Sequence, residues 1–201
     1  MSWPASQRYE LSTAPGGLAL IQDFLNTRPR ARPETADLLD SVRSAQEWAD
    51  DALRQWSEVT GRTYRQVRLT KDDLGELRGV RTRIAEAVRR RGGHEGGPEP
   101  IASIAEVDVN AVVGPDGAVV LEPVGQGWRR IMSAMAIEAH QAQVSNTFRR
   151  LKTCRNPRCP GAFYDRSPNN SGAWHDVLTC GNLANLRASR ARRKTAAERP
   201  S

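Results

Sequence analysis

Residues 151–182, LKTCRNPRCPGAFYDRSPNNSGAWHDVLTCGN, contain every cysteine of the chain, Cys154, Cys159 and Cys180, together with His175. These residues form two close pairs, Cys154-x4-Cys159 and His175-x4-Cys180, which are separated by fifteen residues. Sulfur and imidazole donors in two such pairs fill the four positions of tetrahedral Zn²⁺, because each pair forms one edge of the tetrahedron. The pattern predicts a zinc site without an open position for water or substrate, which favours a structural metal over a catalytic one.

The residues between the ligand pairs predict a small module that depends on its metal. Asp165 and Asp176 are alternatives to His175 as the fourth ligand. We expect a turn at 156–160, a strand at 162–166 and a second turn at 167–172, which give a short hairpin between the two pairs. The segment has too few apolar side chains to fold by burial alone, so metal binding is expected to supply the missing free energy. A treble-clef-like or a zinc-ribbon-like module is consistent with this pattern.

The C-terminal segment is also strongly basic. Residues 149–201 hold twelve Lys and Arg against three acidic residues, a net charge of +9, whereas residues 1–148 sum to −2. After Cys180 we predict a helix with Leu183 and Leu186 packed on the zinc module and a cationic outer side. This charge density favours phosphate contacts and counterion release, the sequence-independent part of DNA affinity. The predicted DNA-contacting residues are Arg155, Arg166, Arg187, Arg190, Arg192, Arg193 and Lys194.

Residues 1–150 are predicted to form a mainly α domain with one small β-hairpin, followed by the zinc module and its basic helix at 151–201. Two β-branched runs around Gly114-Pro115-Asp116-Gly117 predict the hairpin. Ser44 with Glu47, and Thr70 with Asp73, are the expected helix-start signals, and Gly61 is an expected stop. Apolar residues at helical spacing predict helices over 16–27, from about 34, over 44–60, 70–88, 101–107 and 128–150, with a Gly-rich loop at 92–100.

Several function classes are disfavoured by the sequence. No apolar run approaches the roughly 18 residues of a transmembrane helix, and the N-terminal MSWPASQRYE lacks the pattern of a signal peptide, so we expect a cytoplasmic protein with no membrane partner. Three clustered cysteines, an odd number, argue against a secreted disulfide scaffold. We expect no enzyme activity, because the chain lacks a Gly-rich phosphate loop, a GxSxG motif and an HExxH motif.

The string Cys180-Gly181-Asn182, preceded by Trp174-His175 and by Cys154-x4-Cys159, resembles the CGNR-type zinc finger of bacterial transcription regulators. The run Asp23-Phe24-Leu25-Asn26-Thr27 is similar to the DFxNT-like motif that opens the N-terminal ABATE-type domain of the same stress-induced family. This resemblance implies DNA binding by the finger, with sensing or dimerisation by the helical domain. Two positions depart from the family pattern: His175 stands where relatives typically have Cys, and Leu183 replaces the final Arg of the motif.

Together these features predict a bacterial transcription regulator that binds double-stranded DNA, as a homodimer because bacterial operators are usually symmetric. Asp23, Asn26 and Trp48 are candidate residues of a pocket for a small-molecule effector, although side chains of this type more often cap helix ends. A protein-interaction adaptor that binds an acidic partner is one alternative. An RNA-binding protein is another, although the aromatic residues of the module are expected to be committed to packing.

Overall fold

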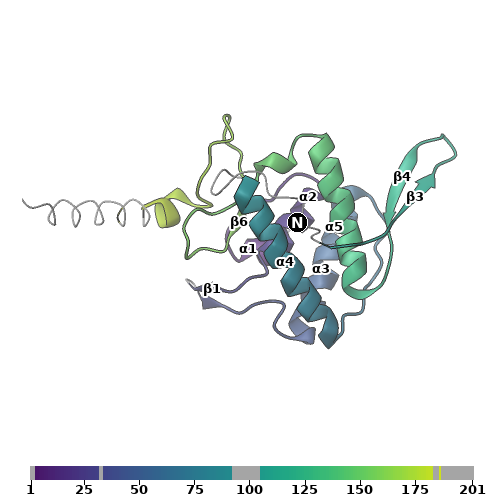
Figure 1. Cartoon of the computed structure of the whole chain (residues 1–201), viewed down its shortest axis with the longest axis horizontal. Coiled ribbons are helices and arrows are strands. Elements are labelled where there is room, and N and C mark those ends of the chain that lie inside the picture. The colour runs from purple at the N-terminus through teal and green to yellow at the C-terminus, as the bar shows by residue number, and fades with distance from the viewer. Residues whose placement is uncertain (1–2, 32–33, 92–104, 183–185, 187–201) are drawn as a thin grey trace, which may run out of the picture.

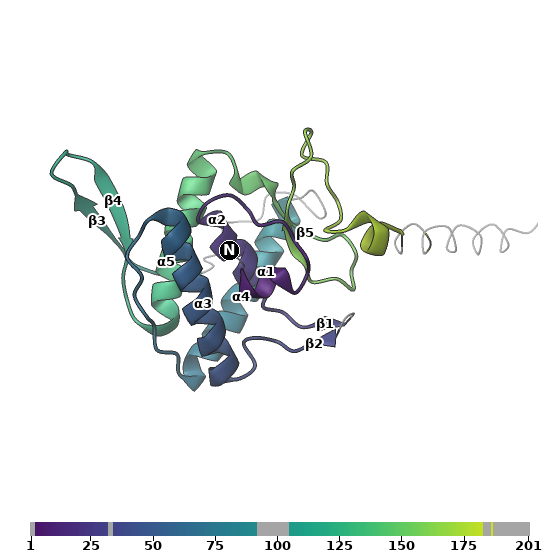
Figure 2. The same ribbon diagram turned by 180° about the vertical axis from the view of Figure 1, so that it is seen from behind.

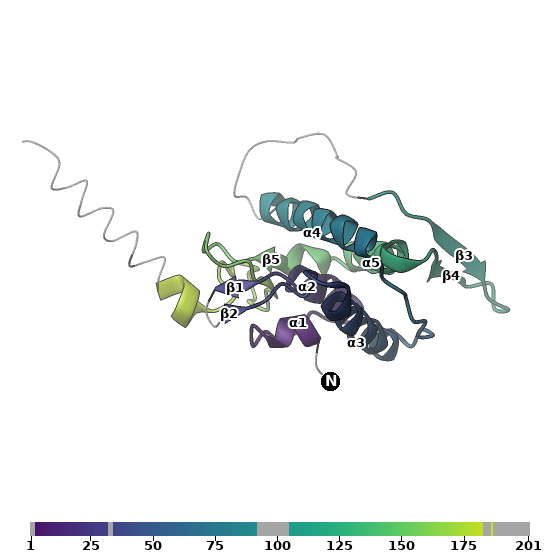
Figure 3. The same ribbon diagram turned by 90° about the horizontal axis from the view of Figure 1, so that it is seen from below.

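The computed structural model describes residues 3–31, 34–91, 105–182 and 186. Helix α2 (Leu18–Leu25) is the centre of the fold, since all eight of its residues are buried. It contacts α3 (Val42–Thr60), α4 (Lys71–Arg91) and α5 (Gly127–Val144), and it lies between α4 and the short helix α1 (Pro4–Gln7) (Figure 3). The predicted mainly helical class is confirmed for the described residues.

The helix boundaries follow the capping chemistry of the sequence. Helix α3 begins one turn earlier than predicted, because Ser41 is the extended N-cap residue and exchanges hydrogen bonds with Ser44. Gly61 ends this helix in the left-handed conformation, with φ of 69°, as predicted. Helix α4 has the predicted start, where the Asp73 carboxylate accepts a hydrogen bond from the Thr70 backbone N–H at 2.6 Å.

The predicted hairpin is formed by β3 (Val109–Val113) and β4 (Val119–Pro123), which pair antiparallel. The chain turns at Gly114–Gly117, where the Gly117 N–H donates to the Gly114 carbonyl. Four valines of this hairpin are exposed: Val112, Val113, Val119 and Val120. The hairpin projects from the helical body at the end opposite residues 177–182 (Figures 1 and 2).

Three predicted helices are wrong in part. The chain near Glu34 is extended, with β2 (Glu34–Thr35) paired to β1 (Arg30–Ala31), and residues 105–108 form no helix before the hairpin, while 101–104 lie outside the described residues. Helix α5 ends at Val144 and does not continue to residue 150. Asn146 follows with φ of 57°, a conformation that Asn tolerates better than most residues, and a 3₁₀ turn, η1 (Phe148–Arg150), leads into a strand.

The C-terminal part packs directly on the helical part. Strand β5 (Leu151–Thr153) pairs antiparallel with β6 (Ala162–Tyr164), and the π-helical turn η2 (Val177–Gly181) follows. Leu151 and Ala162 are fully buried in the same core as α2. Most of the predicted helix after Cys180 lies outside the described residues. Leu186 is described and is 55% exposed, and its packing on the zinc module stays a prediction. Of the helices described, none is both long and apolar enough to cross a bilayer.

Candidate metal centre

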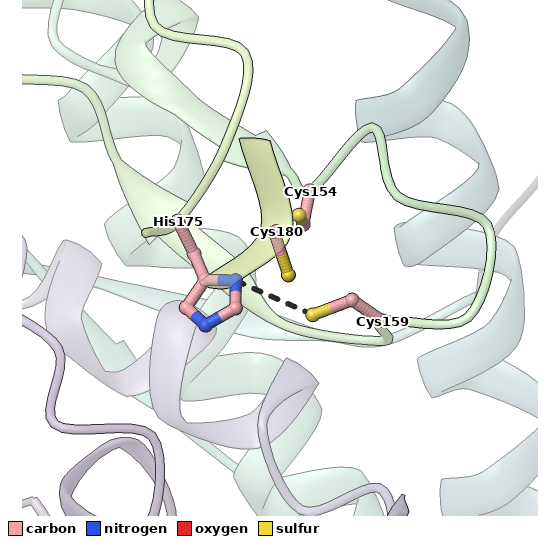
Figure 4. Close-up of side chains that lie close together, drawn as sticks. All are labelled: Cys154, Cys159, His175 and Cys180. Carbon is pink, nitrogen blue, oxygen red and sulfur yellow. Dashed lines mark hydrogen bonds between the residues drawn. The ribbon is translucent and has the colours of Figure 1, made fainter. Parts of the chain in front are cut away.

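The structure brings the four predicted ligands together (Figure 4). The donor atoms of Cys154, Cys159, His175 and Cys180, here called the Cys3His cluster, all lie within 4.8 Å of one another. Tetrahedral zinc with ordinary bond lengths places neighbouring donors roughly 3.5 to 3.8 Å apart. The distance from Cys159 Sγ to His175 Nδ1 is 3.3 Å, and the other ring nitrogen points away from the sulfurs. The cluster therefore has the composition and size of a metal site, with Nδ1 as the imidazole donor.

A tight loop between β5 and β6 positions the first ligand pair. The Cys154 N–H donates to the Gly161 carbonyl and the Cys159 N–H donates to the Asn156 carbonyl, each at 2.8 Å. Gly161 permits a close approach here, since a Cβ at this position would lie 3.3 Å from both Cys159 Sγ and the Tyr9 ring. The hairpin thus encloses the first pair. The predicted hairpin between the two pairs is wrong, because β6 pairs with the strand that precedes Cys154.

The two alternative fourth ligands are engaged in other contacts. Asp176 caps the turn η2, where its carboxylate accepts a hydrogen bond from the Thr179 N–H at 2.8 Å. Asp165 forms a buried ion pair with Lys152 at 2.6 Å and accepts hydrogen bonds from two backbone N–H groups, those of Ser167 and Gly172. Burial raises the pKa of Asp165, but these partners outweigh burial and hold it well below its usual range. His175 is therefore the residue that completes the cluster.

The surroundings of the sulfurs suit three thiolates only when a cation is bound among them. The Gly161 N–H donates to Cys159 Sγ and the Asn156 amide donates to Cys180 Sγ, each at 3.4 Å. Hydrogen bonds from Cys159 and His175 lower the pKa of Cys154 to about 4, against the effect of burial. The hydrogen bond to Cys154 and burial raise the pKa of Cys159, and burial raises that of Cys180. Three thiols this close can all ionise only if a cation offsets their mutual repulsion, so the donor set fits Zn²⁺.

Asn26 connects the metal hairpin to helix α2. Its side-chain Oδ1 accepts from the Ala162 N–H at 2.8 Å, and its Nδ2 donates to the Ala162 carbonyl at 2.9 Å. The amide thus pairs with β6 much as a neighbouring strand would. In addition, the Tyr9 ring lies edge-on to the His175 ring, with an interplanar angle of 88°. The contact between Asn26 and Ala162 joins residues 136 positions apart and was not predicted from the sequence. The position of Asn26 in the DFLNT run is the sequence feature that could have marked it as a residue with a structural role.

Asp23 and Trp48, the other candidate effector-binding residues, lie in the protein core. The Asp23 carboxylate accepts from the N–H groups of Ala5 at 3.0 Å and Ser6 at 2.7 Å, and from the Trp48 indole at 2.9 Å. It therefore caps α1, and capping a helix end is the more common role for such a side chain. Burial raises the pKa of Asp23 to about 6, although these hydrogen bonds oppose the shift. Effector binding at these residues stays a prediction.

The predicted DNA-contacting residues are described only in part. Arg155 and Arg166 are exposed on the metal module. Arg166 donates to the Thr13 carbonyl at 2.7 Å and lies over the Tyr164 ring, so it also holds the module against the N-terminal part. The other five residues of this prediction, Arg187, Arg190, Arg192, Arg193 and Lys194, lie outside the described residues.

A helical core joined to a Cys3His cluster is the architecture of a zinc finger protein with an additional helical domain. Comparison with known families matches both parts: the CGNR zinc finger over residues 150–193, and ABATE, "Putative stress-induced transcription regulator", over residues 18–144. The chain belongs to the ABATE family and carries a CGNR zinc finger, as its resemblance implied. Neither family is enzymatic. A search of the curated proteins found no match.

Proposed function

We propose that this protein regulates transcription by binding double-stranded DNA through its zinc finger and the basic segment that follows. The observation that carries the proposal is the position of the Cys3His cluster at the start of the basic run. Cys180 is a donor of the cluster, and residues 187–194 after it contain five of the Lys and Arg residues. A metal that fixes Cys180 therefore anchors the chain seven residues before the segment with the highest cationic density.

The proposed metal is zinc, and its role is structural. Bound to all four donors, zinc crosslinks the β5–β6 hairpin to the turn η2 and has no open position for a substrate. The first two donors flank a hairpin loop and the last lies in the turn before the C-terminal segment, which supports a treble-clef-like module over a zinc ribbon. Arg155, which is exposed between the first two cysteines, is a proposed contact to the DNA backbone.

The homodimer is also a proposal, and the hairpin β3–β4 supports it. Residues 109–123 contain no Lys or Arg, the residues with which proteins commonly protect a free sheet edge. With four exposed valines, two copies of the hairpin can pair about a two-fold axis. The hairpin lies at the end opposite the metal module (Figure 2), so dimerisation there leaves both fingers free for DNA.

Binding of duplex DNA as a function of salt tests the proposal. Fluorescence anisotropy with genomic fragments should show specific sites above a nonspecific background, and the R187A/R190A double variant should reduce the slope of log K against log salt by about 1.8. The matched control is R43A/R54A, which removes two exposed arginines of α3 and should leave the slope unchanged. If the wild type binds no DNA at low salt, the proposal is overturned. Tighter binding to single-stranded RNA than to duplex DNA would favour the RNA-binding alternative.

A further inference from the structure

A cleft of about 330 Å³ lies between helix α4 and the loop that carries the first two cysteines. This loop runs alongside a helix in the close-up of the cluster (Figure 4). Three arginines line the cleft from separate segments of the chain: Arg28 follows α2, Arg89 lies on α4, and Arg158 lies between Cys154 and Cys159. The cleft therefore combines cations from the ABATE part with one from the zinc finger.

The environment of Arg28 indicates an anionic ligand. Its guanidinium is half-buried and donates to Thr82 Oγ1 at 3.4 Å, but it forms no ion pair with a carboxylate in the described part of the chain. The neighbouring Arg81, by contrast, donates to both Asp37 carboxylate oxygens, at 2.7 and 2.6 Å. Burial, and then the charge of Arg81, lower the pKa of Arg28. A partly desolvated cation of this kind gains most from an anion that enters the cleft.

An ordinary structural role explains only one of the three arginines. Arg89 lies in the last turn of α4, where cations offset the partial negative charge of the helix end. Arg28 and Arg158 lie outside that helix, so this explanation does not extend to them. The Arg158 side chain is exposed on the loop, and its described hydrogen bond is made by its backbone N–H to Asn156.

The charges around the cleft leave a cationic excess. Glu86 is the one carboxylate among the described residues of its lining, and a zinc-bound Cys3His centre carries a net charge of about −1. The three arginines exceed these two negative charges. A smaller depression shares Arg89 and Thr153 with the cleft and adds the exposed Arg155, so the cationic surface continues across the module.

We propose that this cleft is a phosphate-binding site, in which Arg28, Arg89 and Arg158 hold a phosphate of the DNA backbone. Guanidinium groups suit this ligand because their planar donors pair bidentately with phosphate oxygens. Helix α4 then contacts DNA together with the finger, and the ABATE part contributes to the nucleic-acid surface. The assignment of the phosphate to DNA rests on the proposed function, whereas the anion site does not.

A first experiment tests the cleft without DNA. Pyrophosphate is titrated into the full-length zinc-loaded protein at constant ionic strength, with chloride as the reference anion, and binding is measured by calorimetry. Wild-type protein should bind pyrophosphate, R158A should bind about tenfold more weakly, and E86Q about threefold more tightly, because it removes the opposing charge. R54A on α3 is the matched control and should equal the wild type. No binding by the wild type, or equal affinities in all variants, would overturn the site.

A second experiment identifies the source of the phosphate. R158A should lower the slope of log K for DNA against log salt by about 0.9, and E86Q should strengthen DNA binding. If pyrophosphate binding follows the predicted order but the wild type binds no DNA, the proposed function fails and the cleft stands as a site for free phosphates. If DNA binds and neither variant changes it, the DNA assignment is overturned while the proposed function stands.

Discussion

Replacing Asn26 by alanine should loosen the metal hairpin from the helical core. The change removes three hydrogen bonds, one to Ser6 Oγ and two with Ala162, and it leaves the N–H and the carbonyl of Ala162 buried without these partners. Each buried unsatisfied group costs about 1 to 3 kcal/mol, so the two groups should lower the unfolding free energy by about 2 to 6 kcal/mol. The loss should fall mainly on β5–β6, and zinc should therefore transfer to a chromogenic chelator faster than from the wild type.

Gln22 provides a matched control within the same helix. Its amide is equally buried and also bonds one backbone N–H and one carbonyl, those of Ala14 at 2.6 Å and Ser12 at 3.1 Å. Both of these partners lie in the N-terminal part. Q22A should lower the stability to urea by a similar amount with a smaller effect on zinc transfer. Equal rates of zinc transfer from the two variants would refute a specific coupling through Asn26.

Three further predictions address the cluster, the buried carboxyl and the hairpin. H175A should bind less than one zinc per chain by elemental analysis whereas H175C should keep one, and full retention by H175A would remove His175 from the ligand set. Because the pKa of Asp23 is raised from 3.8 to about 6, its contribution to stability is present below about pH 4 and is lost as pH rises through 6, by about 3 kcal/mol at most. D23N should abolish this pH-dependent component in urea titrations from pH 4 to 7, and an unchanged profile would contradict the shift. V113K/V119K should convert a dimer to a monomer in light scattering; a wild-type monomer, or a variant that remains dimeric, would reject the hairpin interface.

The sequence predicted the four residues of the Cys3His cluster, because metal coordination imposes short, local spacing. Cys154-x4-Cys159 and His175-x4-Cys180 could be read directly, and the helical period likewise identified α2 and α4. Choosing His175 over Asp165 and Asp176 required the structure, because only the folded chain shows that Lys152 and the backbone already engage those carboxylates.

The errors arose where the structure depends on distant residues. Strand β5 is only three residues long, and its identity depends on pairing with β6 across the cysteine loop. The end of α5 has no proline or glycine to mark it, and the left-handed Asn146 is a weak signal. Asn26 pairs with a residue 136 positions away, and the DFLNT run marks Asn26 without indicating its partner.

The DNA affinity of the same protein before and after removal of zinc tests the account most directly. The protein as purified should contain one zinc per chain and bind duplex DNA. Chelation should abolish specific binding, and stoichiometric zinc should restore it, because the metal orders the start of the basic segment. DNA affinity that is unchanged in the zinc-free protein would contradict a zinc-ordered DNA-binding finger.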